Sequence, residues 1–427
     1  MLATSLFLLF GLVLLSISVA ASLGLLGLIL GAIYSPMPLY RGLADIVWVN
    51  AIEFLLLAIP LFVFMGEVLL RSGIAARMYE ALTKWLAWLP GGLMHTNVGA
   101  SALFAATSGS SVATAATIGT VALPEAESRG YNERLFLGSL TSGGTLGILI
   151  PPSINLIIFG LLTNTSVPDL YMAGLVPGLL MASIFTMTVL VACLMRPGWG
   201  GARITCTWAE RLRALPELIP PVLIFLLVVG SIYGGLATPT EAAGLGVVGA
   251  LVLAGARKAL SWPMLLSAAE ATMRTTAMVM LIVLAAMFLN FVLGVIGLTQ
   301  ALASFVAQLG WSPTAMMFAI VVFYLILGCF LETLSMLITT APLITPIVIG
   351  LGFDPVWFGV LMMVLLEMAL LTPPIGINLY VVQSVRRKGT LTDVVIGTLP
   401  FLAAMMVMVV LLIAFPGIAL WLPKALG

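Results

Sequence analysis

The sequence has 427 residues, of which 62% are hydrophobic and only 8% are charged, and its mean hydropathy is +1.23. This composition excludes an ordinary soluble domain and indicates a protein that crosses a membrane many times. The net charge of +1 offers no basic field for nucleic acid, and the three cysteines are too dispersed for a zinc site or a disulfide framework.

The first part of the chain predicts apolar spans and one amphipathic helix. Residues 4–34 are too long for one upright span and predict either one kinked span or two short ones. Residues 2–34 lack a basic start and a small-residue cleavage site, so we expect them to lie in the membrane rather than to form a cleaved signal. A clear span is predicted at 54–70. Residues 75–89 mix charged with apolar side chains in a way typical of a helix at the membrane interface.

Two segments predict re-entrant hairpins. Residues 96–124 have the polar centre 107–111 between two apolar arms. Each arm is about 14 residues long, which is too short to cross a hydrocarbon core of ~30 Å, so the segment should enter and leave by the same face. Residues 313–350 repeat the pattern, with 332–335 as the polar tip.

Each hairpin is followed by an apolar run that two prolines interrupt. Pro151-Pro152 breaks the span 132–163, and Pro373-Pro374 breaks the span 355–385. Proline supplies no backbone donor and breaks a helix. Asn155 and Asn378 follow the two breaks at a spacing of 223 residues (378 − 155). Paired interruptions in two halves of a membrane protein indicate a substrate and ion site near the bilayer midplane, so the sequence favours transport.

The other apolar segments complete two similar halves. They predict spans at 171–195, 217–235, 239–256, 275–297 and 392–415, with an amphipathic stretch at 261–274. Each half then consists of a span, a hairpin, a broken span and a span. The fold class is therefore an all-α polytopic membrane protein with two repeats, each containing a re-entrant helical hairpin and a Pro-Pro-broken transmembrane helix.

The basic residues predict the orientation of these repeats. If the hairpin 96–124 opens to the cytoplasm, 15 of the 17 Lys and Arg residues lie on that side, and only Arg41 and Lys424 do not. The opposite loops, 164–170, 236–238 and 298–312, contain neither Lys nor Arg. This asymmetry satisfies the positive-inside rule and makes the second hairpin open outward, so the repeats have inverted topology. The cytoplasmic set is Arg71, Arg77, Lys84, Arg129, Arg134, Arg196, Arg203, Arg211, Arg213, Arg257, Lys258, Arg274, Arg386, Arg387 and Lys388.

The tips and breaks supply groups that bind ions. Half-helix N-termini favour an anion, whereas free carbonyls and hydroxyls favour a hard cation such as Na⁺. We expect the tip 107–111 to face the break 150–155 and the tip 332–335 to face the break 372–378, with a small anion between the tips. The candidate substrate and ion ligands are Thr107, Ser108, Gly109, Ser110, Ser111, Ile150, Pro151, Pro152, Ser153, Asn155, Glu332, Thr333, Ser335, Thr372, Pro373, Pro374, Gly376 and Asn378. The predicted sodium ligands among them are Ser108, Ser110, Ser111, Ser153, Thr333, Thr372 and the carbonyls of Ile150 and Gly376.

The acidic residues in apolar segments have competing interpretations. Glu332 at the second tip is assigned a sodium-linked role, with a scaffold hydrogen bond as the alternative, because an acid there needs a partner. Glu67, Glu241 and Glu367 are interpreted as structural groups that pair with hydroxyls or helix ends. The one histidine, His95, has no evident partner for a proton relay.

Linked motifs along nearly the whole chain resemble a known family. Residues 104–114, 143–153, 233–243, 330–334 and 367–379 are similar to the large membrane (DctM-like) subunit of TRAP transporters, the tripartite ATP-independent periplasmic transporters. Two mild departures are Met368-Ala369 after Glu367 and Ala237 where phenylalanine is usual. Neither affects the proposed ligands.

The resemblance implies an elevator-type carrier in the bacterial inner membrane that uses Na⁺ as coupling ion, with no organic cofactor. It implies two partners in separate chains, a small four-helix membrane subunit and a periplasmic substrate-binding protein. The substrate would be an organic acid such as a C4-dicarboxylate, sialic acid or another sugar acid. The domains expected are a scaffold at 1–95, transport half 1 at 96–170, a scaffold at 171–297, transport half 2 at 313–391 and a C-terminal span at 392–427.

Two alternatives remain beside the tripartite carrier. One is a stand-alone sodium–organic anion symporter that needs no binding protein. The other is an intramembrane enzyme, which is disfavoured because the sequence has neither a His-Glu-x-x-His metal motif nor a GxSxG nucleophile elbow. We therefore expect no enzyme.

Overall fold

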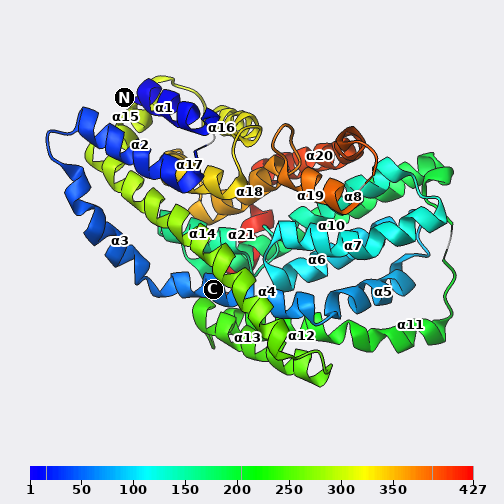
Figure 1. The fold of residues 1–427 in the computed structure, drawn as a ribbon. Coiled ribbons are helices and arrows are strands. Elements are labelled where there is room, and N and C mark those ends of the chain that lie inside the picture. Colours follow the sequence, from blue (N-terminus) through cyan, green and yellow to red (C-terminus); the bar gives the residue numbers. More distant parts are fainter. Residues whose placement is uncertain (16, 203, 387, 427) are drawn as a thin grey trace.

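The computed structural model describes residues 1–15, 17–202, 204–386 and 388–426, and within these ranges the regular secondary structure is helical (Figure 1). Arg203 and Arg387, which entered the charge count, lie outside the described residues. In the described part, six helices are long and apolar enough to cross a membrane, and the bent pair Trp208–Glu217 and Ile219–Tyr233 would add a seventh. The expected multi-pass helical fold is confirmed.

The N-terminal segment forms two short helices, as one of the two sequence alternatives predicted. They are α1 (Leu2–Leu14) and α2 (Val19–Tyr34), and they are followed by α3 (Leu43–Ala51), which was not predicted. The span expected at 54–70 is the 3-10 turn η2 (Phe54–Leu57) continued by α4 (Ala58–Arg71). The remaining short turn before α3 is η1 (Leu39–Gly42).

The amphipathic helix expected at 75–89 is α5 (Ile74–Leu86). It buries Met78 and Tyr79 and exposes Arg77 and Glu80, as the helical period requires. Its buried face packs against α6 and α7 as well as α4. The Tyr79 hydroxyl donates to Asn97 Oδ1 at 2.8 Å, so this helix is fastened to the first hairpin.

Helix pairs meet at both polar tips, as predicted, but their second arms are longer than the expected length of about 14 residues. The first hairpin pairs α6 (Leu93–Ser108) with α7 (Ser111–Arg129), and the second pairs α16 (Pro313–Gly328) with α17 (Thr333–Gly350). The arm Ser111–Arg129 has 19 residues, and the arm Thr333–Gly350, with 18, is long and apolar enough to cross a membrane. Each tip ends one helix and starts the next because its residues are good caps. Gly109 has a left-handed φ of +60°, which suits a helix C-terminus. Ser110 and Glu332 are the N-caps of α7 and α17.

Both Pro-Pro runs break their spans, and the breaks are wider than the prolines themselves. The first separates α8 (Glu133–Thr145) from α9 (Ile154–Thr163), and the second separates α18 (Pro355–Ala369) from α19 (Ile377–Arg386). Both Pro-Pro peptide bonds are cis.

The two halves are interlocked by exchanged contacts. Helix α7 of the first hairpin packs against α19 of the second half, and α17 of the second hairpin packs against α9 of the first half. Within each half, both hairpin arms also pack against the helix that precedes the break, α8 or α18. This reciprocal pattern is what two related repeats around a pseudo-twofold axis would produce, and it brings both tips toward one region.

The remaining helices surround this centre. Helix α14 crosses the view diagonally in Figure 1 and packs against α2, α3, α4 and α17. The helices and turns not yet given are α10 (Val167–Met195), η3 (Pro197–Trp199), α11 (Trp208–Ala214), η4 (Leu215–Glu217), α12 (Ile219–Tyr233), α13 (Pro239–Ala256), α14 (Trp262–Val295), α15 (Leu298–Gln308), α20 (Leu391–Ala414) and α21 (Gly417–Leu426).

Two details of the sequence prediction are wrong in this region. The amphipathic stretch 261–274 and the span 275–297 are not separate, because α14 runs unbroken for 34 residues. The segment 298–312, expected as a loop, contains the helix α15. Its apolar residues Leu298, Leu302 and Phe305 follow a helical period, which favours a helix over a loop.

Ion pairs join the two halves at the end of the molecule that the positive-inside rule places in the cytoplasm. The buried Arg386 guanidinium at the end of α19 lies 2.7 Å from Glu133 Oε1 at the start of α8. Arg134 Nε lies 3.0 Å from Asp393 Oδ1 at the start of α20. These contacts hold the first broken helix beside the second.

Candidate functional site

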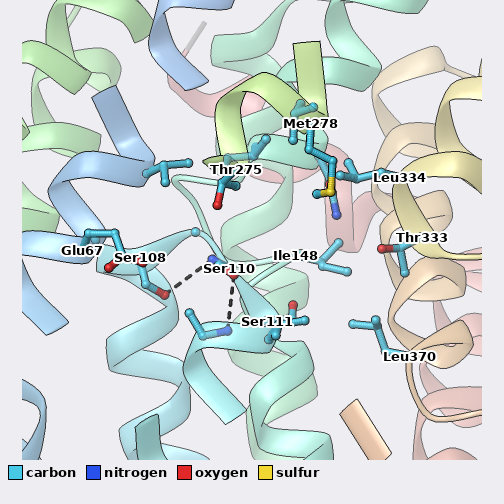
Figure 2. Close-up of a pocket in the computed structure, with 18 of the residues that line it drawn as sticks. Glu67, Ser108, Ser110, Ser111, Ile148, Thr275, Met278, Thr333, Leu334 and Leu370 are labelled. Atoms are coloured by element: carbon cyan, nitrogen blue, oxygen red, sulfur yellow. Dashed lines mark hydrogen bonds between the residues drawn. The ribbon is translucent and has the colours of Figure 1, made fainter. Parts of the chain in front are cut away.

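A cavity of about 300 Å³ lies where the two hairpin tips meet α4 and α14. Figure 2 shows Ser108, Ser110 and Ser111 of the first tip opposite Thr333 and Leu334 of the second, with Thr275 and Met278 of α14 above them. The cavity therefore lies between the tips, in the position expected for a small ligand.

The first tip is held by its own hydroxyls and by the first break. Ser110 Oγ accepts from the Ala113 amide at 3.4 Å, and Ser108 Oγ lies 3.1 Å from Thr114 Oγ1. A Cβ built on Gly109 would lie 2.9 Å from the Pro152 carbonyl oxygen. The expected contact between the first tip and the first break is therefore present.

Behind this tip, the break 146–153 supplies buried oxygens. Ser111 Oγ donates to the Thr145 carbonyl at 3.2 Å, and Ser153 Oγ donates to the Ile148 carbonyl at 2.5 Å. Ser153 is the N-cap residue of α9, but its side chain accepts no capping hydrogen bond. The amides at the start of α9 therefore stay free for another acceptor, next to Asn155, which lines the cavity.

The second tip carries a carboxylate whose two oxygens already accept hydrogen bonds from neighbouring residues. Glu332 accepts hydrogen bonds from the Leu334 and Ser335 amides at 3.0 and 3.1 Å. It also accepts from the hydroxyls of Thr333 and Ser335 at 3.2 and 2.9 Å. Its negative charge thus lies at the positive N-terminus of α17. This geometry matches the scaffold hydrogen bond that was the alternative to a sodium-linked role.

Residues 372–378 of the second break do not line the cavity, although Leu370 at the start of this break does. Thr372 Oγ1 donates to the Met368 carbonyl at 2.7 Å, and the buried Asn378 donates from Nδ2 to the Thr141 carbonyl at 3.4 Å. Pro373 and Pro374 are exposed, whereas both prolines of the first break are buried. The second tip does not cover its break in the way that the first tip does.

The structure thus gathers only part of the predicted ligand set around the cavity. The candidate residues that line it are Ser108, Gly109, Ser110, Ser111, Asn155, Glu332 and Thr333. The candidate residues that are not among its lining residues are Thr107, Ile150, Pro151, Pro152, Ser153, Ser335, Thr372, Pro373, Pro374, Gly376 and Asn378.

The lining residues that were not predicted as site residues include Glu67, Thr275 and Met278. Thr275 and Met278 come from α14, and no local signal distinguishes them from other residues of a long apolar helix. Glu67 of α4 was expected to pair structurally, and it does lie 3.0 Å from Arg71, yet it also lines the cavity. Its position in an apolar segment was the signal that could have found it.

The electrostatics of the cavity depend on backbone rather than on basic side chains. Among the described lining residues, the charged ones are Glu67 and Glu332, and each is compensated by Arg71 or by a helix N-terminus. The starts of α7 and α9 meet the same cavity at 111–113 and 154–155. Ser110 caps the Ala113 amide of α7, whereas α9 has no side-chain cap. Helix N-termini with free amides attract anions, so the start of α9 is where the cavity best suits a carboxylate.

The chain is similar to known proteins over nearly its whole length. Residues 6–418 match the family described as "Tripartite ATP-independent periplasmic transporter, DctM component". The C4-dicarboxylate TRAP transporter large permease protein DctM of Vibrio cholerae serotype O1 is 31% identical over 97% of this chain and 96% of its own. The sialic acid TRAP transporter large permease protein SiaM of the same organism is 32% identical over 87% of each chain.

One solved structure has a similar fold. The crystal structure of the Alcanivorax borkumensis YdaH transporter matches with a TM-score of 0.60 over 93% of this chain and 97% of that chain. Because the sequence identity is 16%, this likeness concerns the fold alone.

Proposed function

This chain belongs to the DctM family of tripartite ATP-independent periplasmic transporters, and we propose that it imports a small organic acid across the bacterial inner membrane with a sodium gradient. The observation that carries this proposal is the cavity between the two hairpin tips, onto which the N-termini of α7 and α9 converge. A carboxylate there would accept hydrogen bonds from free amides, without any basic side chain.

The substrate is an organic acid of a class that its relatives transport. The names of two relatives state C4-dicarboxylate and sialic acid, so these and other sugar acids are the candidates. A substrate carboxylate would lie beside Ser111 and Asn155, and the remaining polar groups of the substrate would face the second tip at Thr333.

Sodium would bind at the first tip and its break. Neutral hydroxyl and carbonyl oxygens are the ligands that suit a weakly held monovalent ion. Ser108, Ser110 and Ser111 lie within reach of the carbonyls of the break, as the contact of Gly109 with Pro152 supports. Ser153 and the Ile150 carbonyl complete this set at the first break, whereas Thr333, Thr372 and the Gly376 carbonyl are the sodium ligands proposed for the second half.

Transport would proceed by an elevator movement of the tips against α4 and α14. A Cβ on Gly66 of α4 would lie 3.1 Å from both Cα and the carbonyl oxygen of Ser108. No side chain separates the backbones of Gly66 and Ser108 at this contact, so the first tip can slide along α4 here. The interlocked halves 96–170 and 313–391 would then move together as the transport domain.

We propose that this chain works with a small four-helix membrane subunit and a periplasmic substrate-binding protein, each a separate chain. This follows from membership of a family whose description includes the words tripartite and periplasmic. The alternative is a stand-alone sodium–organic anion symporter, which would need neither partner.

Uptake into proteoliposomes tests these proposals together. Labelled succinate, sialic acid and a sugar acid would be offered under an inward sodium gradient to this chain alone, to this chain with its small subunit, and to both with the binding protein. Uptake only by the complete set, lost when choline replaces sodium, is the expected result. Uptake by this chain alone would favour the stand-alone symporter, and uptake unaffected by sodium would overturn the proposed coupling.

A further inference from the structure

A fully buried carboxyl group lies one helical turn below the cavity, outside the proposed ligand set. Glu367 in the last turn of α18 is 0% exposed, and Leu370, three residues later, lines the cavity. Glu367 Oε2 lies 3.5 Å from Thr145 Oγ1 of α8. Its other oxygen, Oε1, has no hydrogen-bond partner in the described part of the chain.

No basic group compensates this carboxyl among the described residues. Glu367 occurs in none of their ion pairs. Helix α18 packs against α9, α10, α16, α17, α20 and α21, and Glu367 itself touches α8. The ionisable side chains on these helices, with the N-cap of α17, are Glu133, Arg134, Asp169, Tyr171, Cys193, Tyr324, Glu332, Asp393 and Lys424. An ionised carboxylate in this place would be a buried charge without a counter-charge, which is strongly unfavourable.

The hydroxyl of Thr145 indicates where a neutralising proton would lie. Thr145 Oγ1 lies within donor distance of two acceptors, the Ser142 carbonyl at 2.8 Å and Glu367 Oε2 at 3.5 Å. A threonine hydroxyl has only one hydrogen, and we assign it to the nearer acceptor, Ser142. The longer contact with Glu367 is then made by a lone pair of Thr145 Oγ1. That lone pair can accept from a protonated carboxyl but repels an ionised one.

Thr145 also connects this carboxyl to the first hairpin tip. Its carbonyl accepts the hydroxyl hydrogen of Ser111, and Ser111 lines the cavity. A change in the charge of Glu367 therefore acts on the residue that holds Ser111 in place. This link runs through two adjacent contacts, from α18 to α8 and from α8 to the tip.

We propose that Glu367 is a proton-binding site coupled to the first hairpin tip through Thr145. In this conformation its carboxyl O–H donates to Thr145 Oγ1. When the tip moves away and water reaches the site from the cavity, the proton passes to water and leaves a carboxylate. The consequence for uptake, a dependence on pH, rests on the proposed carrier function, whereas the presence of the bound proton does not.

Infrared difference spectroscopy on the purified protein tests the bound proton without any substrate. At neutral pH the wild type should show the C=O stretch of a protonated carboxyl, and Glu367→Gln should lack it. Glu270→Gln, which removes a carboxyl that is exposed and paired with Arg274, should retain the band. A band of unchanged intensity in Glu367→Gln would overturn the proposal.

A second variant keeps the test decisive if Glu367→Gln does not fold. Thr145→Val preserves the side-chain shape and removes the oxygen that accepts the proton, so the carboxyl band should shift in frequency. An unshifted band would show that Thr145 is not the acceptor and would overturn the proposed coupling. In proteoliposomes, Glu367→Gln should flatten the pH profile of uptake. If the variant kept the pH profile of the wild type, that result would also count against the proposal. An absence of uptake by the wild type would instead contradict the carrier function and leave the infrared result standing.

Discussion

Gly109 at the first hairpin tip packs directly against Pro152 of the first break. Gly109 has a φ of +60°, and a Cβ at this position would lie 2.9 Å from the Pro152 carbonyl oxygen. The tip and the break therefore form one unit, in which glycine is needed both for the backbone conformation and for the space.

Replacing Gly109 by alanine should disturb this unit more than the backbone conformation alone would. The left-handed conformation costs an L-residue about 1–2 kcal/mol, and the contact with Pro152 adds to that cost. Gly73→Ala is the matched control, because Gly73 has a φ of +72° and open space around its Cβ position. Both variants bear the backbone cost, so the difference between them comes from the contact, and overpacking typically costs about 1–3 kcal/mol. We expect Gly109→Ala to lower sodium-driven uptake by about tenfold or more relative to Gly73→Ala, since ~1.4 kcal/mol corresponds to tenfold. Equal uptake by the two variants would contradict the role of the contact.

The carboxylate of Glu332 should matter as a helix cap rather than as a charge facing the substrate. Removing an N-cap side chain costs about 0.5–2 kcal/mol, and aspartate is itself a preferred N-cap residue. Glu332→Ala should therefore lower both thermal stability in detergent and uptake, while Glu332→Asp should retain most of both. If Glu332→Asp were as damaged as Glu332→Ala, a direct role of the glutamate in ligand binding would be the better explanation.

A larger side chain at Gly66 should obstruct the sliding of the first tip along α4. Overpacking typically costs about 1–3 kcal/mol, and here the added atoms would meet the backbone of Ser108. We expect Gly66→Leu to reduce uptake strongly while the protein still assembles in the membrane. Gly244→Leu on α13 is the control, because a Cβ there would meet no atom within 4 Å. Uptake by Gly66→Leu at the level of this control would argue against an elevator movement past α4.

The inverted topology predicts that the loops at Asn164 and Lys258 lie on opposite sides of the membrane. Both residues are exposed, so a cysteine at either position is accessible to a reagent on its own side. In intact cells, a membrane-impermeant maleimide should label Asn164→Cys above the level of the unsubstituted chain. It should label Lys258→Cys only after the membrane is opened. Labelling of both from the same side would overturn the orientation of the repeats.

The sequence by itself determined the two hairpins, the two broken helices and the family. Both hairpins and both broken helices lie where polar tips and proline pairs predicted them, because capping and the loss of a backbone donor act within a few residues. The resemblance to the large TRAP subunit is confirmed by a family match over residues 6–418. Linked motifs along a chain are a sequence property, so they need no structure to be found.

Only the tertiary structure decided which of these elements share a site. The sequence predicted two equivalent tip and break pairs, whereas the cavity takes the first pair, the second tip, four residues of α4, three residues of α14 and, from the second break, only Leu370. The structure also places Glu367 of the second half against Thr145 of the first half. This contact gives a functional interpretation to a buried carboxyl that the sequence analysis interpreted as structural. The reason is physical. Local sequence sets the backbone of a segment, but the neighbours of its side chains depend on how helices far apart in the chain pack together.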